Sequence, residues 1–317
     1  MSNSKVAQWS CAVQGFWPNI RVRGQCYLTS TASRCTVFRV QIVSMEDVVV
    51  RNVAEKTFLP TKALLEEVGN MVILTGKTVV AAVRPPYPYG AEFVGQFMFA
   101  LKLCWFPLLV STVAFGYEAP GLQAADFLVL FGALDRLGGF FVLASIREFA
   151  PFVTAVVLAG VAGTAITADL GARKIREELD ALQVLGVDPI KNLVVPRFLA
   201  LMLVTGLFDI YALLFGIFGG VLATVVNHAP LGPFWATFFN NTSTTDLWGS
   251  VLKTTLFGAI IAIVCCYKGM TASGGAEGVG RAVNEAVVIA FNGIFAFNYA
   301  FTQTLLATHP EITTIPK

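Results

Sequence analysis

The chain alternates between long apolar runs and shorter polar segments. The apolar runs predict membrane-spanning helices at residues 92–117, 137–168, 196–226, 247–267 and 284–307. A helix needs about 20 apolar residues to cross a hydrocarbon layer about 30 Å thick. A straight helix over the second run would be about 48 Å long, so we expect it to tilt or bend. Pro151 is the expected bend, because proline removes one backbone donor.

The connections between these runs predict two loops and one flexible turn. Residues 118–126 and 227–246 are polar segments that carry prolines, and we interpret both as loops. Residues 268–283 are rich in glycine but lack the GxGxxG frame of a phosphate-binding turn, which favours a flexible turn without a phosphate site.

The first 88 residues divide into a basic extension and an amphipathic helix. Residues 1–56 are predicted to be disordered, and within 1–44 the chain has basic side chains and no acid. Residues 57–88 have the pattern of a helix that lies in the membrane interface. Its apolar face is expected to comprise Leu64, Leu65, Val68, Met71, Val72 and Val79.

The composition agrees with a polytopic membrane protein. Hydrophobic residues make up 56% of the chain and charged residues 13%, and the mean hydropathy is +0.69. Soluble domains carry about 25% charged residues. We therefore predict an all-α membrane protein: an N-terminal interfacial helix, five transmembrane helices within residues 89–308, a cytoplasmic helix between the second and third spans, and an outer tail at 309–317.

The orientation follows from the placement of basic residues near the spans. One set of connections contains Arg84, Arg173, Lys174, Arg176, Lys191, Arg197, Lys268 and Arg281, whereas the opposite set contains only Arg136 and Lys317. Cytoplasmic loops carry the excess of lysine and arginine. The segment between the second and third spans is therefore predicted to be cytoplasmic, and the C-terminus to lie outside.

That cytoplasmic segment has the pattern of an amphipathic helix. One apolar stripe is formed by Ile175, Leu179, Leu182 and Leu185. Charges on and around the remaining surface include Glu177, Glu178 and Asp180, and Gly186 is a suitable C-terminal stop. The pattern fits two roles equally: a helix that lies on the lipid surface, or one that docks into a soluble partner.

Charged residues inside the apolar runs are the candidates for function. They are Arg147, Glu148, Asp209 and Lys253. Charges in a membrane are costly and must face protein, water or each other. Arg147 and Glu148 would line a polar substrate cavity or form a buried pair that fixes helix packing. An ion-coupled secondary transporter that uses Glu148, Asp209 and Lys253 is the alternative function.

Small residues predict close helix packing. The glycines concerned are Gly160, Gly163, Gly216 and Gly220, the last two in a GxxxG spacing. No Walker A motif, serine–histidine–acid order, paired-carboxylate motif or metal-binding cysteine and histidine array is present, so nothing indicates covalent chemistry, a metal site or a cofactor in this chain. Active transport would need a partner or an ion gradient.

Several motifs resemble the MlaE/YrbE permease family, the membrane subunits of ABC-type lipid transporters that work with MCE-domain proteins. They are Arg147-Glu148 with Pro151, Ala159-Gly160, Ala162-Gly163, the run from Ala168 to Gly171, the sequence EELDAL at 177–182, the run from Gly186 to Pro189, Val195-Pro196-Arg197, Lys253, Gly269 and the run from Gly278 to Ala282. The resemblance covers about residues 60–308. The amino-acid sequence of the central motif is most similar to that of the actinobacterial, Mce-associated branch.

The resemblance implies a bacterial cytoplasmic membrane complex. It would contain a second YrbE-type permease, a dimer of a cytoplasmic ATPase that binds ATP and Mg²⁺, MCE-domain proteins on the outer side, and a phospholipid, fatty acid or sterol as cargo, with no nucleic acid. The helix at 175–185 would be the coupling helix, and Arg147 and Glu148 would line the lipid cavity. Family members often carry a basic residue where this chain has Val161. The role of that basic residue in the family is therefore not carried over to position 161.

Overall fold

The computed structural model describes residues 7–9, 24–26, 45–85 and 89–309, and the chain forms two units, 1–66 and 67–317. In the first unit, β1 (Ala7–Trp9) pairs antiparallel with β2 (Gly24–Cys26). Helix α1 (Met45–Val83) begins in this unit, so residues 45–56 are helical although the sequence predicts them to be disordered. The remaining residues of the extension, and residues 310–317 of the predicted tail, lie outside the described residues.

The second unit contains helical segments that are long and apolar enough to span a membrane. Five such segments occur in the described part of the chain: Gly90–Leu130, Leu134–Ile175, Ile190–Val226, Thr244–Met270 and Gly275–Thr308. The predicted all-α architecture with five spans is confirmed. Each segment is longer than the apolar run that predicted it, because helical structure continues into the polar ends.

The first spanning segment consists of α2 (Gly90–Tyr117), the π-helical η1 (Glu118–Gln123) and α3 (Ala124–Leu130). The predicted loop at 118–126 is therefore wrong. Pro120, Gly121, Ala124 and Ala125 are buried within it. These small residues pack against α8 (Val195–Val226) and the nearby turns, and the wider π turn accommodates a proline that has no backbone donor.

The second spanning segment is interrupted twice by π-helical turns. It contains η2 (Leu134–Arg136), α4 (Leu137–Phe141), η3 (Val142–Phe149), α5 (Ala150–Leu158), η4 (Ala159–Gly163) and α6 (Thr164–Ile175). Pro151 lies in the first turn of α5, immediately after η3. The π turn and the proline thus occur together, at the place where the sequence predicts a bend.

In the second half of the bundle, two further segments that were predicted to be a loop and a turn are largely helical. It comprises η5 (Ile190–Val194), α8 (Val195–Val226), α9 (Leu231–Asn241), α10 (Thr244–Met270) and α11 (Gly275–Thr308). The predicted loop 227–246 contains α9, which buries Phe234 and Phe238. The predicted flexible turn 268–283 is mostly helix: only 271–274 connect α10 to α11, and Gly278 sits so close to Ser273 that a side chain would not fit.

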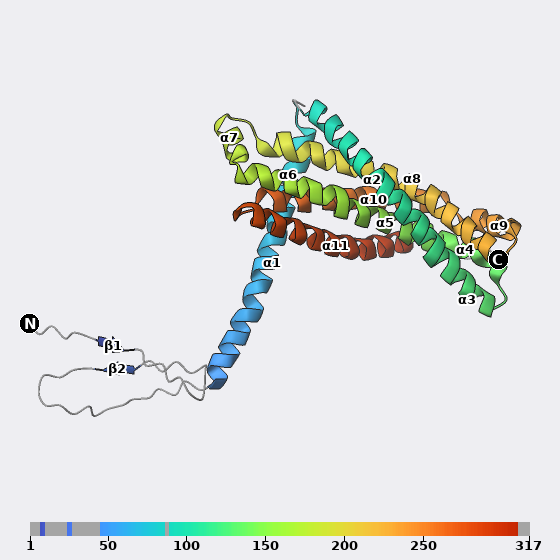
Figure 1. Ribbon diagram of the computed structural model, residues 1–317, viewed down its shortest axis with the longest axis horizontal. Helices are drawn as coiled ribbons and strands as arrows, with labels where there is room; N and C mark the ends of the chain where they lie inside the picture. Colours follow the sequence, from blue (N-terminus) through green and yellow to red (C-terminus); the bar gives the residue numbers. More distant parts are fainter. Residues whose placement is uncertain (1–6, 10–23, 27–44, 86–88, 310–317) are drawn as a thin grey trace, which may run out of the picture. The chain divides into compact units, whose positions relative to one another are not determined.

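Helices α8 and α10 pack side by side in the middle of the second unit, with α2 along α8 and α11 along α10 (Figure 1). Small residues allow these approaches. Gly216 faces Gly116 of α2, Gly220 lies against the ring of Phe141, and a Cβ on Gly163 would lie 2.9 Å from Cys265 Sγ. Gly160 is exposed, and a Cβ there would meet no described atom within 4 Å, so its predicted role in helix packing has no counterpart among the described residues.

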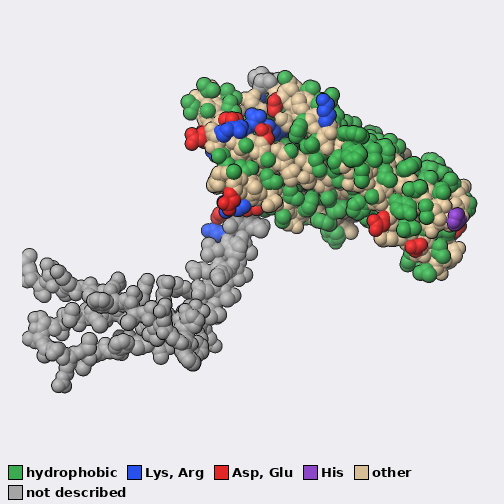
Figure 2. Space-filling model, viewed as in Figure 1, with side chains coloured by type: hydrophobic (Ala, Val, Ile, Leu, Met, Phe, Trp, Pro, Cys, Tyr) green, Lys and Arg blue, Asp and Glu red, His purple; other side chains and the backbone are tan. Residues whose placement is uncertain are grey.

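The charged side chains of the second unit are unevenly distributed. On the face shown in Figure 2, most lie at the end of the second unit that carries α7 (Glu178–Val184), whereas the middle is covered by hydrophobic side chains. The last turns of α1 bury Met71, Leu74 and Thr78 against the core. The apolar face predicted for this helix is divided: Met71 packs in the core, whereas Val72 is 65% exposed and Val79 is 46% exposed.

Candidate functional site

The charges predicted to lie inside the membrane come together with further polar residues on α10 and α11. Arg147 does not pair with its neighbour Glu148. Its Nε lies 2.8 Å from Oδ1 of Asp246, whose side chain is fully buried. Asp246 also closes the capping box of α10, because it accepts from the backbone N–H of Ser243 at 3.1 Å. One carboxylate therefore caps α10 and binds the second span.

Glu148 pairs with Lys253 of α10. The Lys253 Nζ lies 3.4 Å from Glu148 Oε1 and donates to the backbone oxygen of Arg147 at 2.6 Å. Glu148 also accepts from Asn298 Nδ2 at 2.8 Å and from Thr302 Oγ1 at 2.9 Å. The lysine side chain is 4% exposed and the glutamate 38% exposed. Glu148 is thus the member of the pair that reaches the molecular surface.

Asp209 of α8 lies in the same region but makes no ion pair within the described residues. Its side chain is buried and accepts from Ser250 Oγ at 2.7 Å, while its other oxygen has no hydrogen-bond partner in the described part of the chain. Asp209 therefore joins the cluster through Ser250 of α10, whereas the ion pair of Lys253 is with Glu148.

Sequence reasoning missed Asp246, Asn298 and Thr302. The S-x-x-D spacing of Ser243 and Asp246 is a capping signal that marks the start of α10, although it gives no hint of Arg147. The cavity beside these residues has a volume of about 20 Å³, which is room for about one water molecule. The cavity is therefore too small for a ligand much larger than water.

The segment at residues 176–189, here called the elbow, connects the second and third spans. Its helix α7 (Glu178–Val184) is separated from α6 by Arg176 and Glu177, and Glu177 has a left-handed backbone with φ 59°. The prediction of one continuous amphipathic helix over 175–185 is therefore wrong. Two exposed ion pairs lie across the break: Lys174 Nζ is 2.9 Å from Asp180, and Arg176 Nε is 2.7 Å from Glu178.

The end of α7 has the geometry that the sequence predicts. Gly186 has φ 76°, its N–H donates to Gln183, and the N–H of Val187 donates to Leu182 at 2.9 Å. This is a Schellman motif with glycine at the left-handed position. Asp188 then accepts from the N–H of Ile190 at 2.9 Å and opens the next helical segment.

The break at Glu177 divides the predicted apolar stripe. Leu179 is buried and Leu182 packs against the core, so these two residues anchor α7. Ile175 is 37% exposed and Leu185 is 76% exposed, beside Val184 at 88%. The outward face of the elbow thus presents apolar side chains next to charged ones.

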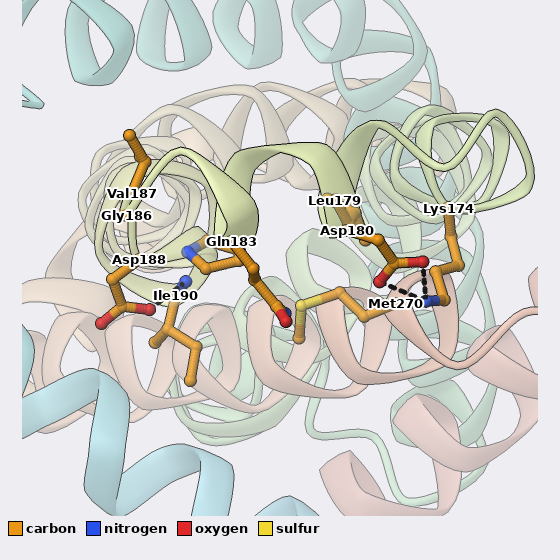
Figure 3. A pocket seen from close by; sticks show the side chains of 10 residues that line it. Lys174, Leu179, Asp180, Gln183, Gly186, Val187, Asp188, Ile190 and Met270 are labelled. Atoms are coloured by element: carbon orange, nitrogen blue, oxygen red, sulfur yellow. Dashed lines mark hydrogen bonds and ion pairs between the residues drawn. The ribbon is translucent and has the colours of Figure 1, made fainter.

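An open cleft of about 540 Å³ lies beside α7 (Figure 3). Leu179, Gln183 and the Lys174–Asp180 pair line one side, and Met270 at the end of α10 lines another. Within the described residues, no group of three or more histidine, cysteine, aspartate or glutamate side chains could hold a metal ion.

A family model described as the MlaE permease matches residues 93–304, which is more than half of the chain. The chain belongs to the MlaE permease family. The match covers all five spanning segments except their extreme ends. The chain is thus a multi-pass membrane permease.

Individual relatives agree with this assignment. A probable ABC transporter permease protein from Synechocystis sp. is 38% identical over 180 residues, 56% of this chain and 68% of the relative. One of the same description from Rickettsia typhi is 29% identical over 255 residues, 80% of this chain and 98% of the relative. The intermembrane phospholipid transport system permease protein MlaE from Haemophilus influenzae is 31% identical over 187 residues, 58% and 72% of the two chains.

Proposed function

We propose that this chain is the membrane subunit of an ABC-type lipid transporter in a bacterial cytoplasmic membrane. A separate ATPase dimer, which binds ATP and Mg²⁺, would supply the energy at the elbow. The membership of the MlaE family supports this role, and the Haemophilus influenzae relative is named as a phospholipid transport permease. The cargo would be a phospholipid, a fatty acid or a sterol.

The observation that carries the proposal is the elbow itself. It presents exposed Val184 and Leu185 beside Glu177 and Asp180, between two spanning segments. Exposed apolar side chains surrounded by charges are typical of a protein-contact surface. The basic residues that flank it favour the cytoplasmic side, where an ATPase would be found.

The lipid path would run along the exposed edge of the polar cluster. Glu148 is partly exposed and is held by Asn298 and Thr302 of α11. The adjoining cavity is too small for a lipid, so a second YrbE-type permease subunit would complete the lipid site. MCE-domain proteins would receive or deliver the lipid on the outer side, as the sequence resemblance to the Mce-associated branch implies.

A binding experiment with matched variants tests the elbow. Leu185→Asp introduces a charge at the exposed end of α7, and Leu130→Asp makes the same change at the end of α3, where Leu130 is 81% exposed. We expect Leu185→Asp to lower the amount of ATPase that co-purifies by about tenfold or more, the effect of losing one interface hot spot. Leu130→Asp should leave it unchanged. Undiminished ATPase recovery with Leu185→Asp would refute docking at the elbow.

A further inference from the structure

The base of the elbow contains a buried arginine that the transport site does not use. Arg197, in the first turn of α8, is 1% exposed. Its guanidinium donates to the backbone oxygen of Leu193 at 2.8 Å and to Oδ2 of Asp169 at 2.6 Å. Asp169 also accepts from Arg173 Nε at 3.2 Å, and Glu92 at the start of α2 lies 3.9 Å from Arg197.

This arginine joins the two helices on either side of the elbow. Asp169 belongs to α6, and Arg197 follows it by 28 residues. A buried guanidinium is costly unless it is paired and hydrogen-bonded, so separating α6 from α8 here would leave an uncompensated charge. The pair therefore favours conformations in which the two ends of the elbow stay together.

The other ion pairs of the elbow lack this property. The side chains of Arg176 and Glu178 are 61% and 43% exposed, and those of Lys174 and Asp180 are 34% and 54% exposed. Solvent-exposed pairs contribute little to rigidity, because water replaces the lost contact. Among these ion pairs at and beside the elbow, the Arg197–Asp169 contact differs in having a fully buried member.

We propose that Asp169 and Arg197 are positioning residues that transmit movement of the elbow to the spans. A displacement of α7 would carry α6 and α8 together, and through Glu92 it would also reach α2. The role rests on the proposed function, in which an ATPase docks at the elbow. It predicts that breaking the pair separates ATP hydrolysis from lipid movement without removing the ATPase.

The test compares variants in the assembled complex, reconstituted in liposomes with a fluorescently labelled phosphatidylethanolamine as the probe. Arg197→Met removes the buried charge and leaves Asp169 partly exposed and paired with Arg173. Arg173→Gln is the matched control, because it removes the other bond to Asp169 and keeps the buried one. The readouts are ATPase co-purification, ATP hydrolysis, and lipid moved per ATP hydrolysed.

We expect Arg197→Met to keep ATPase co-purification and hydrolysis but to lower lipid moved per ATP by about tenfold, the factor for losing one hydrogen bond to a charged group. Arg173→Gln should behave like the unmodified chain. Arg197→Lys, which keeps the positive charge, should lower lipid moved per ATP less than Arg197→Met does. Unchanged lipid movement per ATP with Arg197→Met would overturn the proposal, as would loss of ATPase binding.

A second variant keeps the test decisive if Arg197→Met does not fold. Asp169→Asn retains an acceptor for Arg197 but removes its counter-charge, and it should lower lipid moved per ATP to an intermediate level. Full coupling in this variant would also refute the role. If the unmodified chain recovers no ATPase, the proposed function itself fails, which is a distinct result.

Discussion

For the Glu148–Lys253 pair, we predict that removing the glutamate destabilises the protein more than removing the lysine does. Lys253 is 4% exposed, so Glu148→Leu leaves a buried ammonium without its counter-charge. Removing one partner of a buried pair costs about 3–5 kcal/mol. Lys253→Met instead leaves Glu148, which is 38% exposed and keeps its bonds to Asn298 and Thr302. That change should cost about 1.5–3 kcal/mol, the value of hydrogen bonds to a charged group.

Thermal unfolding of the purified variants in mild detergent measures the difference, at about 2–4 °C in Tm for each kcal/mol. The double variant Glu148→Leu/Lys253→Met should recover at least half of the loss seen with Glu148→Leu, because no unpaired charge remains. Glu178→Leu is the control, since its ion pair is exposed, and its Tm should stay near that of the unmodified chain. A larger loss for Lys253→Met than for Glu148→Leu would refute the assigned burial and pairing.

Two backbone predictions concern glycine. Gly220→Ala should lower the free energy of unfolding by about 1–3 kcal/mol, because the added methyl meets the ring of Phe141 in a packed core. The control Gly160→Ala should leave Tm unchanged. Equal losses of stability in the two variants would contradict the packing. Glu177→Gly should raise the free energy of unfolding by up to about 1 kcal/mol, because glycine adopts the left-handed backbone without the cost paid by glutamate; a clear drop in Tm would show that Glu177 does not hold this conformation.

The spanning segments were predictable from the sequence, because the need to bury apolar side chains in lipid sets a length that composition alone reveals. Their ends were not. Residues 118–126 look polar in sequence, yet Gly121 and Ala125 are buried in η1 and α3. Contacts with a neighbouring helix determine whether such residues are helical and buried. Those contacts join segments that lie far apart in the chain.

The charges were predictable as candidates, but their partners were not. Arg147 stands next to Glu148 in the sequence, yet it pairs with Asp246, 99 residues away, and Glu148 accepts from Asn298, 150 residues away. The stop at Gly186 could be predicted, because glycine marks a left-handed turn locally. The break at Glu177 has no such signal, since glutamate favours a helix.

The central claim, that the chain is a lipid permease driven by a separate ATPase, is tested most directly by purifying it from native membranes in mild detergent and identifying the bound proteins and lipids by mass spectrometry. We predict an ABC-type ATPase, a second permease subunit, MCE-domain proteins and a bound lipid. Recovery of the chain alone, in a form that moves its substrate on a pH gradient without ATP, would contradict the account.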